Sequence, residues 1–448
     1  MTFVFNGIPF LLFLAGFLVV FALTPRKYRL YALLVGSLVF CFVNSWIGAL
    51  IALAFTGINY LLGGLLQSAR PRGRRLLLAL GVFLNAGTLL VLKFVNWMPV
   101  GMSYYTFACI AYLADIYKGS LQAEYNFFRF AAFVTMFPKF LQGPITRYGE
   151  LAPQLTEPQQ NDFRFQEGLE LFIFGLCLKV LLADKLSTMW TGSLEQYGFS
   201  EIPTPLAWLG AYSYSIQLYL DWHSYTLMAV GLGRMLGYEL PRNFDSPYMA
   251  KTVGGFYRRW HMTLTRWFTD YIYIPLGGNR NGTLDTVSNI LIVWLVTGLW
   301  HMNGGWNWNF LIWGLSLGLL AVLERLLWGK FLEKSHVLGH LYVLFFIPLT
   351  WVCFKIPALT DLQLYFSRMF PLFSSIPWNR FIEVFWEVLK NYWPYLLAGI
   401  FFCTPLPEKL LKRFSRSLVL SLILAVLFWW AVYSIHRNGS NPFGYLMH

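Results

Sequence analysis

Three of the seven histidines, His223, His261 and His301, stand among aromatic residues beside or inside an apolar stretch. A neutral imidazole is the usual side chain for taking a proton from a reacting hydroxyl near neutral pH. A titratable group at membrane depth is costly, and for that reason it indicates a functional site. The pattern therefore predicts acid–base chemistry by histidines lying within a membrane.

His301 is the strongest candidate for a functional histidine, because the apolar run 289–300 leads directly to it. A polar turn that contains Asn303 and two glycines follows, and then the run Trp306-Asn307-Trp308-Asn309. This context places His301 at the end of a helix. The alternative is a neutral, hydrogen-bonded histidine at a membrane interface.

Asp221 and His223 lie between the apolar runs 212–220 and 226–236, which places charge near membrane depth. A functional cavity would account for them. The alternative is that Asp221 pairs with a nearby arginine, such as Arg234, to fix helix packing.

His261 directly follows Arg258, Arg259 and Trp260. Two cationic neighbours disfavour a charged imidazole and favour the neutral form that can act as a base. The two arginines could equally anchor the chain to lipid headgroups.

The segment around His261 is compatible with one helix that starts at Phe256 and ends at Pro275, Gly277 and Gly278. Its aromatic and leucine side chains fall at helical spacing and form one apolar stripe. The stripe consists of Trp260, Leu264, Trp267 and Tyr271, with Arg258, Arg259, Arg266 and Asp270 elsewhere. We expect a surface or re-entrant helix that lines a cavity, since polar backbone at membrane depth needs protein or water around it.

The elements that position these residues are apolar helices. The 448 residues are 57% hydrophobic and 12% charged, against about 25% charged residues in average soluble domains. Several runs approach or exceed the roughly 17 residues that span a bilayer: 8–24, 46–66, 76–92, 289–300 continuing past a polar break, 308–327 and 417–434. Shorter or charged runs are 30–43, 101–117, 131–145, 168–182 and 206–220. With about eleven to thirteen such elements, the sequence predicts an all-α polytopic membrane protein in one domain, residues 1–448.

Net charge is +13, but the basic residues sit in short loops between apolar runs, which is the pattern of cytoplasmic loops and not of nucleic-acid binding. The basic clusters lie at 26–29, 70–75 and 409–416. If these clusters are cytoplasmic, counting the spans from them puts both termini outside the cytoplasm, so the number of spans is expected to be even. The five cysteines are scattered, with neither disulfide nor metal spacing, so no metal site is expected. Gly314 to Gly318 resembles a hydrolase nucleophile motif, but inside an apolar helix it indicates close helix packing.

Several separated motifs resemble those of the membrane-bound O-acyltransferase family, in its bacterial alginate O-acetyltransferase branch. They run from Pro99 to Phe107, from Ala111 to Gly119, from Phe137 to Lys139, from Gly143 to Tyr148, from Gln217 to Asp221 with Asn243-Phe244, from Arg258 to His261, from Tyr273 to Arg280, and from Thr297 to His301. The resemblance implies a helical bundle around a tunnel, with the acyl donor entering from the cytosolic side and the acceptor from the outer side. It implies that His301 is the catalytic residue and His261 the second family histidine. Residues expected along the tunnel are Asp221, His223, Tyr225, Arg258, Arg259, Trp260, Asp270, Trp300 and Asn303.

The sequence departs from the family pattern at a few positions. The segment after His301 is about three residues longer than the family's turn, which puts the shape of the cavity there in doubt. Thr269 stands where the family has an arginine, and His223 replaces a small residue. An extra titratable group at 223 could alter acceptor preference.

The implied function is O-acylation, most simply O-acetylation, of an exported polysaccharide resembling alginate or cellulose. Peptidoglycan and teichoic acid are the alternative acceptors. The implied donor is acetyl-coenzyme A or another acyl thioester, with no bound cofactor, and an exported acyltransferase- or esterase-like protein is the expected partner, in a bacterial inner membrane. The rival from another class is a transporter or flippase with an Asp/His proton relay, although the chain shows no inverted repeat.

Overall fold

The computed structural model describes residues 3–157, 162–373, 377–439, 441 and 443, and every regular element among them is helical. The chain forms two compact units built from interleaved segments. The first comprises Met1–Leu176, Ser224–Asn243 and Ser415–Pro442, and the second comprises Cys177–His223, Phe244–Phe414 and Phe443–His448. The expectation of a single domain stays a prediction.

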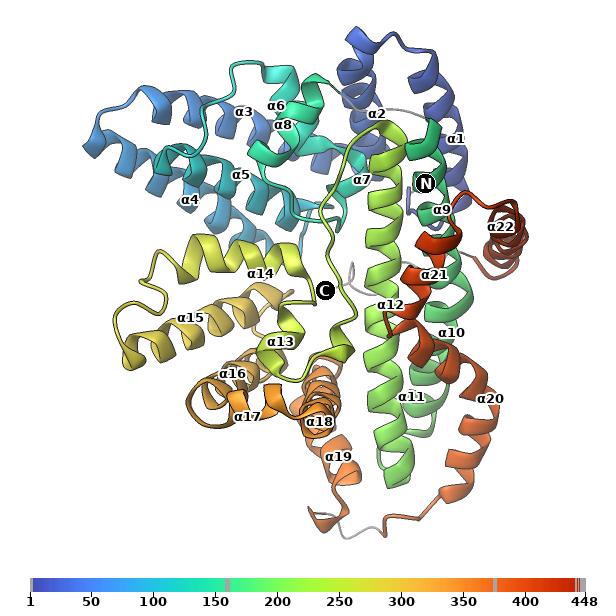
Figure 1. Cartoon of the computed structure of the whole chain (residues 1–448). Coiled ribbons are helices and arrows are strands. Elements are labelled where there is room, and N and C mark those ends of the chain that lie inside the picture. The colour runs from blue at the N-terminus through green and yellow to red at the C-terminus, as the bar shows by residue number, and fades with distance from the viewer. Residues whose placement is uncertain (1–2, 158–161, 374–376, 440, 442, 444–448) are drawn as a thin grey trace. The chain divides into compact units, whose positions relative to one another are not determined.

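The first unit contains the N-terminal helices and the last helix of the chain (Figure 1). Its helices are α1 (Ile8–Leu23), α2 (Arg29–Asn44), α3 (Trp46–Ser68), α4 (Pro71–Phe94), α5 (Met102–Lys118), α6 (Phe127–Thr135), α7 (Phe137–Phe140), α8 (Tyr148–Thr156), α9 (Asp162–Cys177), the second part of α12 (Thr204–Leu236) and α22 (Leu418–Asn438). Helices α3, α4 and α5 pack against one another. Ser45 and Ser417 cap α3 and α22, each accepting a hydrogen bond from a backbone N–H of the first turn.

The second unit contains the helices that carry His261 and His301. They are α10 (Asp184–Met189), α11 (Glu195–Tyr197), the first part of α12, α13 (Val253–Tyr257), α14 (Met262–Phe268), α15 (Thr283–His301), α16 (Trp308–Leu323), α17 (Gly329–Lys334), α18 (His336–Lys355), α19 (Leu359–Met369), α20 (Ile382–Phe402) and α21 (Leu406–Phe414). Short 3₁₀ and π turns join several of them, among them the π turn Thr269–Tyr273 after α14.

Seven helical stretches in the described chain are long and apolar enough to cross a bilayer. They are Arg26–Asn44, Trp46–Ser68, Pro71–Phe94, Thr283–His301, Trp308–Lys334, His336–Lys355 and Leu418–Asn438, and the shorter apolar helix Ile8–Leu23 precedes them. The protein is therefore an all-α, multi-pass membrane protein, as predicted. Helix α18 (His336–Lys355) is a candidate span that was not among the predicted apolar runs.

Three predicted elements differ from the observed ones. The run 131–145 is not one helix, because α6 stops at Thr135, Met136 is non-helical and Pro138 follows within α7. The helix expected from Phe256 is broken between α13 and α14. The run 206–220 extends through Asp221 to Leu236 as one continuous helix, α12.

Glycines bring α15 and α16 close together beneath His301. A Cβ atom at Gly298 would lie 2.8 Å from the backbone oxygen of Phe310, and one at Gly314 would lie 2.7 Å from the backbone oxygen of Trp294. Real side chains do not fit at such distances, so only glycine permits this approach. The predicted packing role of the Gly314–Gly318 pattern is confirmed, and its effect is to hold the end of α15 against α16.

Candidate active site

The second unit encloses a cavity of about 360 Å³. Nine aromatic side chains line it, and both His261 and His301 line it as well. The aromatic members are Trp222, Tyr257, Trp260, Phe268, Tyr273, Trp294, Trp313, Trp351 and Phe354. A cavity of this size and composition is typical of a small-molecule site in which a few polar groups fix orientation.

His301 is the last residue of α15 and is buried among aromatic rings. Its imidazole lies edge-on to Trp313, with ring centroids 4.9 Å apart, and near Phe354 at 5.1 Å and Phe310 at 5.9 Å. Helix α15 ends because the backbone of Met302 is non-helical, with ψ 141°. The helix end and the surrounding rings together restrict the position of the imidazole.

His261 occupies the turn between α13 and α14 with a left-handed backbone, φ +43°. Few non-glycine residues adopt this conformation, and its cost is often tolerated at functional sites. The turn breaks the single helix that the sequence predicted. It places the imidazole against Trp222, with ring centroids 4.3 Å apart.

Burial lowers the pKa of His261 to about 3, so its imidazole is neutral at physiological pH. The neutral form was expected from the sequence, but as an effect of the positive charges on Arg258 and Arg259. Those two side chains are 66% and 43% exposed, and each lies near a carboxylate, Glu333 at 3.8 Å and Asp245 at 3.9 Å. The cause of the lowered pKa is therefore desolvation and not repulsion by the arginines.

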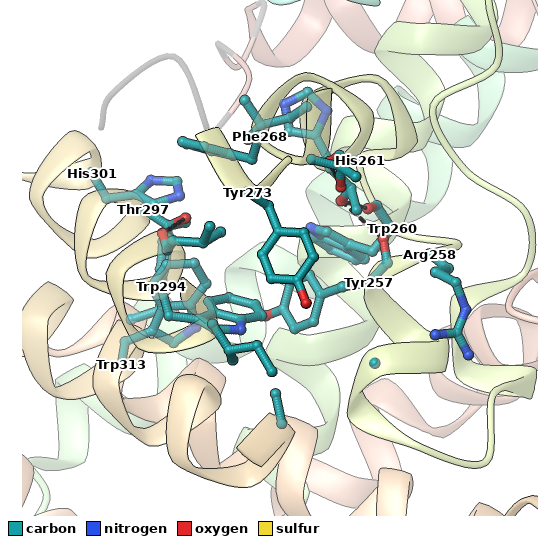
Figure 2. A pocket seen from close by; sticks show the side chains of 18 of the residues that line it. Tyr257, Arg258, Trp260, His261, Phe268, Tyr273, Trp294, Thr297, His301 and Trp313 are labelled. Carbon is teal, nitrogen blue, oxygen red and sulfur yellow. Dashed lines mark hydrogen bonds between the residues drawn. The ribbon is translucent and has the colours of Figure 1, made fainter. Parts of the chain in front are cut away.

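The two histidines come from different sides of the cavity. Figure 2 shows His301 on α15, beside Thr297, and His261 across the cavity near Trp260. Tyr273 also lines the cavity. A small group bound there would meet one imidazole at each side, which is an arrangement suited to proton transfer at one end and positioning at the other.

Arg258 and Trp260 are the other predicted tunnel residues that line the cavity. Trp260 is buried, stacks on Phe256 at 5.4 Å and contacts Trp351 at 4.9 Å. Arg259 lies outside the lining and its Nη1 is 3.3 Å from the backbone oxygen of Asp245.

Asp221 lies outside the cavity lining and accepts a hydrogen bond from Lys179 at 2.5 Å. Lys179 is also 2.7 Å from Asp184, so one buried ammonium bridges two carboxylates. The pairing with Arg234 that the sequence allowed is wrong, because α12 is continuous and 13 residues of helix separate the two positions by about 20 Å. Arg234 instead lies 3.4 Å from Glu239.

His223 also lies outside the lining. Its Nε2 is 3.3 Å from Glu408 of α21, and its ring stacks on Tyr219 at 5.1 Å.

The remaining predicted tunnel residues are not part of the lining either. Asp270 is 4.0 Å from Arg266, and Trp300 packs beside His301 with ring centroids 4.5 Å apart. The backbone N–H of Asn303 donates to Asn307 at 3.1 Å. Tyr225 belongs to the first unit, where its hydroxyl accepts a hydrogen bond from the backbone N–H of Gln142 at 3.4 Å.

The cavity contains side chains that the sequence analysis missed. Tyr257, Tyr273, Trp294 and Trp313 line it, yet in the sequence they are aromatic residues among many others. Among the described residues there is no group of three or more His, Cys, Asp or Glu side chains that could hold a metal ion.

Comparison with known proteins decides the class of this site. The sequence profile of the membrane-bound O-acyltransferase family matches residues 117–354, which is more than half of the chain and includes both cavity histidines. The chain belongs to the membrane-bound O-acyltransferase family. It is therefore an acyltransferase, and His261 and His301 are the titratable imidazoles of its cavity.

Relatives in this family act on surface polymers, according to their names. A "probable alginate O-acetylase" of Azotobacter vinelandii is 34% identical over 396 residues, covering 82% of this chain and 78% of the relative. A protein of the same name from Pseudomonas aeruginosa is 34% identical over 408 residues, which cover 84% of this chain and 76% of that relative. A peptidoglycan O-acetyltransferase of Helicobacter pylori is 32% identical over 352 residues, covering 66% and 65%.

Proposed function

We propose that this acyltransferase moves an acyl group, most simply acetyl, from a cytosolic thioester to hydroxyl groups of an exported polysaccharide of the alginate or cellulose kind. The arrangement of His301 and a neutral His261 on opposite sides of one aromatic cavity carries the proposal. Acetyl-coenzyme A is the proposed donor and no resident cofactor is required.

His301 is the proposed general base. The acceptor hydroxyl loses its proton to the imidazole as its oxygen attacks the thioester carbonyl carbon. A carbon–oxygen bond forms, the carbon–sulfur bond breaks, and the leaving thiolate takes the proton back from His301. His261, neutral at physiological pH, donates or accepts a hydrogen bond that orients one reactant.

The aromatic wall of the cavity supports this chemistry because an apolar site strengthens electrostatic interactions and limits hydrolysis of the thioester. We propose that the cavity belongs to a tunnel open to donor and acceptor from opposite sides of a bacterial inner membrane. The basic loop clusters support a topology with both termini outside the cytoplasm. We also propose an exported acyltransferase- or esterase-like partner protein.

Peptidoglycan is the second candidate acceptor, because the Helicobacter pylori relative named for it is almost as similar to this chain as the alginate relatives are. Teichoic acid has weaker support. The relative named a teichoic acid D-alanyltransferase, from Streptococcus thermophilus, is 28% identical over 245 residues. Family membership favours all of these over the transporter that the sequence alone allowed.

The acceptor is tested by measuring ester on each isolated surface polymer of a deletion strain complemented with wild-type protein. Loss of ester from the exopolysaccharide in the deletion strain, restored by the wild type, supports the proposal, and the released acid identifies the acyl group. Loss of ester from peptidoglycan alone would replace the proposed acceptor with the second candidate.

A further inference from the structure

Tyr257 is a buried cavity residue whose hydroxyl has no hydrogen-bond partner in the part of the chain that the structure describes. It is the last residue of α13, lines the cavity and is only 9% exposed. Its ring lies edge-on to Trp294, with centroids 4.6 Å apart, and its backbone oxygen accepts a hydrogen bond from Thr265 at 3.0 Å. These contacts fix the backbone and the ring, yet the hydroxyl has no hydrogen-bond partner among the described residues.

Trp313 is a second donor of this kind in the same wall. It is 2% exposed, lines the cavity, and its indole Nε1 also has no hydrogen-bond partner in the described part of the chain. Its ring packs edge-on to Trp294, at 6.2 Å, and to His301, at 4.9 Å. Tyr257, Trp294, Trp313 and His301 therefore form a continuous wall, which is visible in Figure 2.

The chemistry of the two groups identifies what they would bind. An indole N–H can only donate, and a buried phenol readily donates. Leaving such donors buried without an acceptor is unfavourable, so their presence in a ligand cavity indicates an acceptor oxygen on the ligand. Both donors stand in the wall that ends at His301, where the proposed reaction takes place.

We propose that Tyr257 Oη and Trp313 Nε1 donate hydrogen bonds to the carbonyl oxygen of the acyl thioester. This inference rests on the proposed function. When the acceptor oxygen attacks the carbonyl carbon, the carbonyl π electrons move to this oxygen, which becomes an oxyanion. The two donors stabilise the negative charge until the carbon–sulfur bond breaks and the carbonyl re-forms. Hydrogen-bond donors placed in this way stabilise the negatively charged transition state more than they stabilise the bound thioester.

Tyr257→Phe tests the proposal because it removes only the hydroxyl. Tyr238→Phe is the matched control, since Tyr238 is fully buried, its hydroxyl also lacks a hydrogen-bond partner in the described chain, and it lies outside the cavity lining in the first unit. Neither change removes a hydrogen bond, so both variants should fold with unchanged melting temperatures.

The rates are measured on the purified full-length protein with acetyl-coenzyme A and an oligosaccharide of the polymer that the complementation experiment identifies. We expect Tyr257→Phe to lower kcat by about 10²-fold or more with little change in KM for acetyl-coenzyme A, and Tyr238→Phe to keep the wild-type kcat. Trp313→Phe is expected to lower kcat in the same way.

A Tyr257→Phe protein with wild-type kcat would overturn this inference, as would an equal loss in Tyr238→Phe or a change confined to KM. In each of those cases an active wild type and an inactive His301→Ala protein would leave the proposed function standing. A folded wild type that transfers no acyl group to any of the surface polymers would overturn both.

Discussion

The imidazole of His301 lies edge-on to the indole of Trp313, with ring centroids 4.9 Å apart and ring planes at 89°. His301 ends α15, Trp313 lies in the second turn of α16, and glycines at the contact let the two helices approach closely. The position of the proposed base therefore depends on how α15 and α16 pack.

Gly298→Ala should disturb this packing. The new methyl group would lie 2.8 Å from the backbone oxygen of Phe310, so α15 and α16 must move apart at a cost of about 1–3 kcal/mol. We expect a lower melting temperature and at least a tenfold lower acyl-transfer rate. Gly57→Ala, in α3, is the control because nothing lies within 4 Å of its new methyl group. Wild-type rates in Gly298→Ala would show that the close approach does not position His301.

Asp221→Asn should lower the free energy of unfolding. The change removes one of the two carboxylates that pair with the buried ammonium of Lys179. Because Asp184 still pairs with this ammonium at 2.7 Å, the expected cost is that of one hydrogen bond to a charged group, about 1.5–3 kcal/mol. Thermal or denaturant unfolding would measure the loss. A stable but inactive Asp221→Asn protein would instead place Asp221 in the chemistry.

Two features of the site show where sequence reasoning succeeds. The apolar run before His301 predicts its place at a helix end, and the glycine pattern 314–318 predicts helix packing. Both signals are local, because they depend on residues within a few turns of one helix.

Other features depend on the tertiary structure. Lys179 and Asp221 are 42 residues apart, and nothing near either residue marks the other as its partner. The left-handed backbone at His261 is equally hidden, because the surrounding residues suit a continuous helix. Tyr257 is one of 25 tyrosines, and only the structure shows that it lines the cavity and that its hydroxyl has no hydrogen-bond partner among the described residues.

His261 should make the protein less stable in mild acid. Its pKa falls from about 6.5 in the unfolded chain to about 3 in the folded one, so below pH 6.5 only the unfolded state takes up the proton. Stability therefore decreases as the pH falls from about 6.5 towards 3. When the pH falls from 7 to 5, the free energy of unfolding of the wild type should decrease by about 2 kcal/mol more than that of His261→Asn.

Unfolding measured across this range for the wild type, His261→Asn and His436→Ala would check the assignment. The control replaces an exposed histidine on α22, and it should follow the wild type. Identical pH profiles for the wild type and His261→Asn would contradict the burial of His261.

His223→Ala should retain acyl transfer within about threefold of the wild type, because His223 contacts Glu408 and Tyr219 outside the cavity lining. His223 is buried and its ring stacks on Tyr219, so the alanine variant is also expected to have a lower melting temperature. The assay should use the polymer that the complementation experiment identifies. A large change in acceptor preference would show instead that position 223 does select the acceptor, as the departure from the family pattern first indicated.

The most direct test of the central claim is the acyl-transfer rate of His301→Ala, measured on purified full-length protein with acetyl-coenzyme A and an oligosaccharide of the identified polymer. If His301 is the general base, the rate falls by about 10²-fold or more, while His436→Ala keeps the wild-type rate and both variants keep the wild-type melting temperature. A folded His301→Ala protein that transfers acyl groups at the wild-type rate would contradict the account.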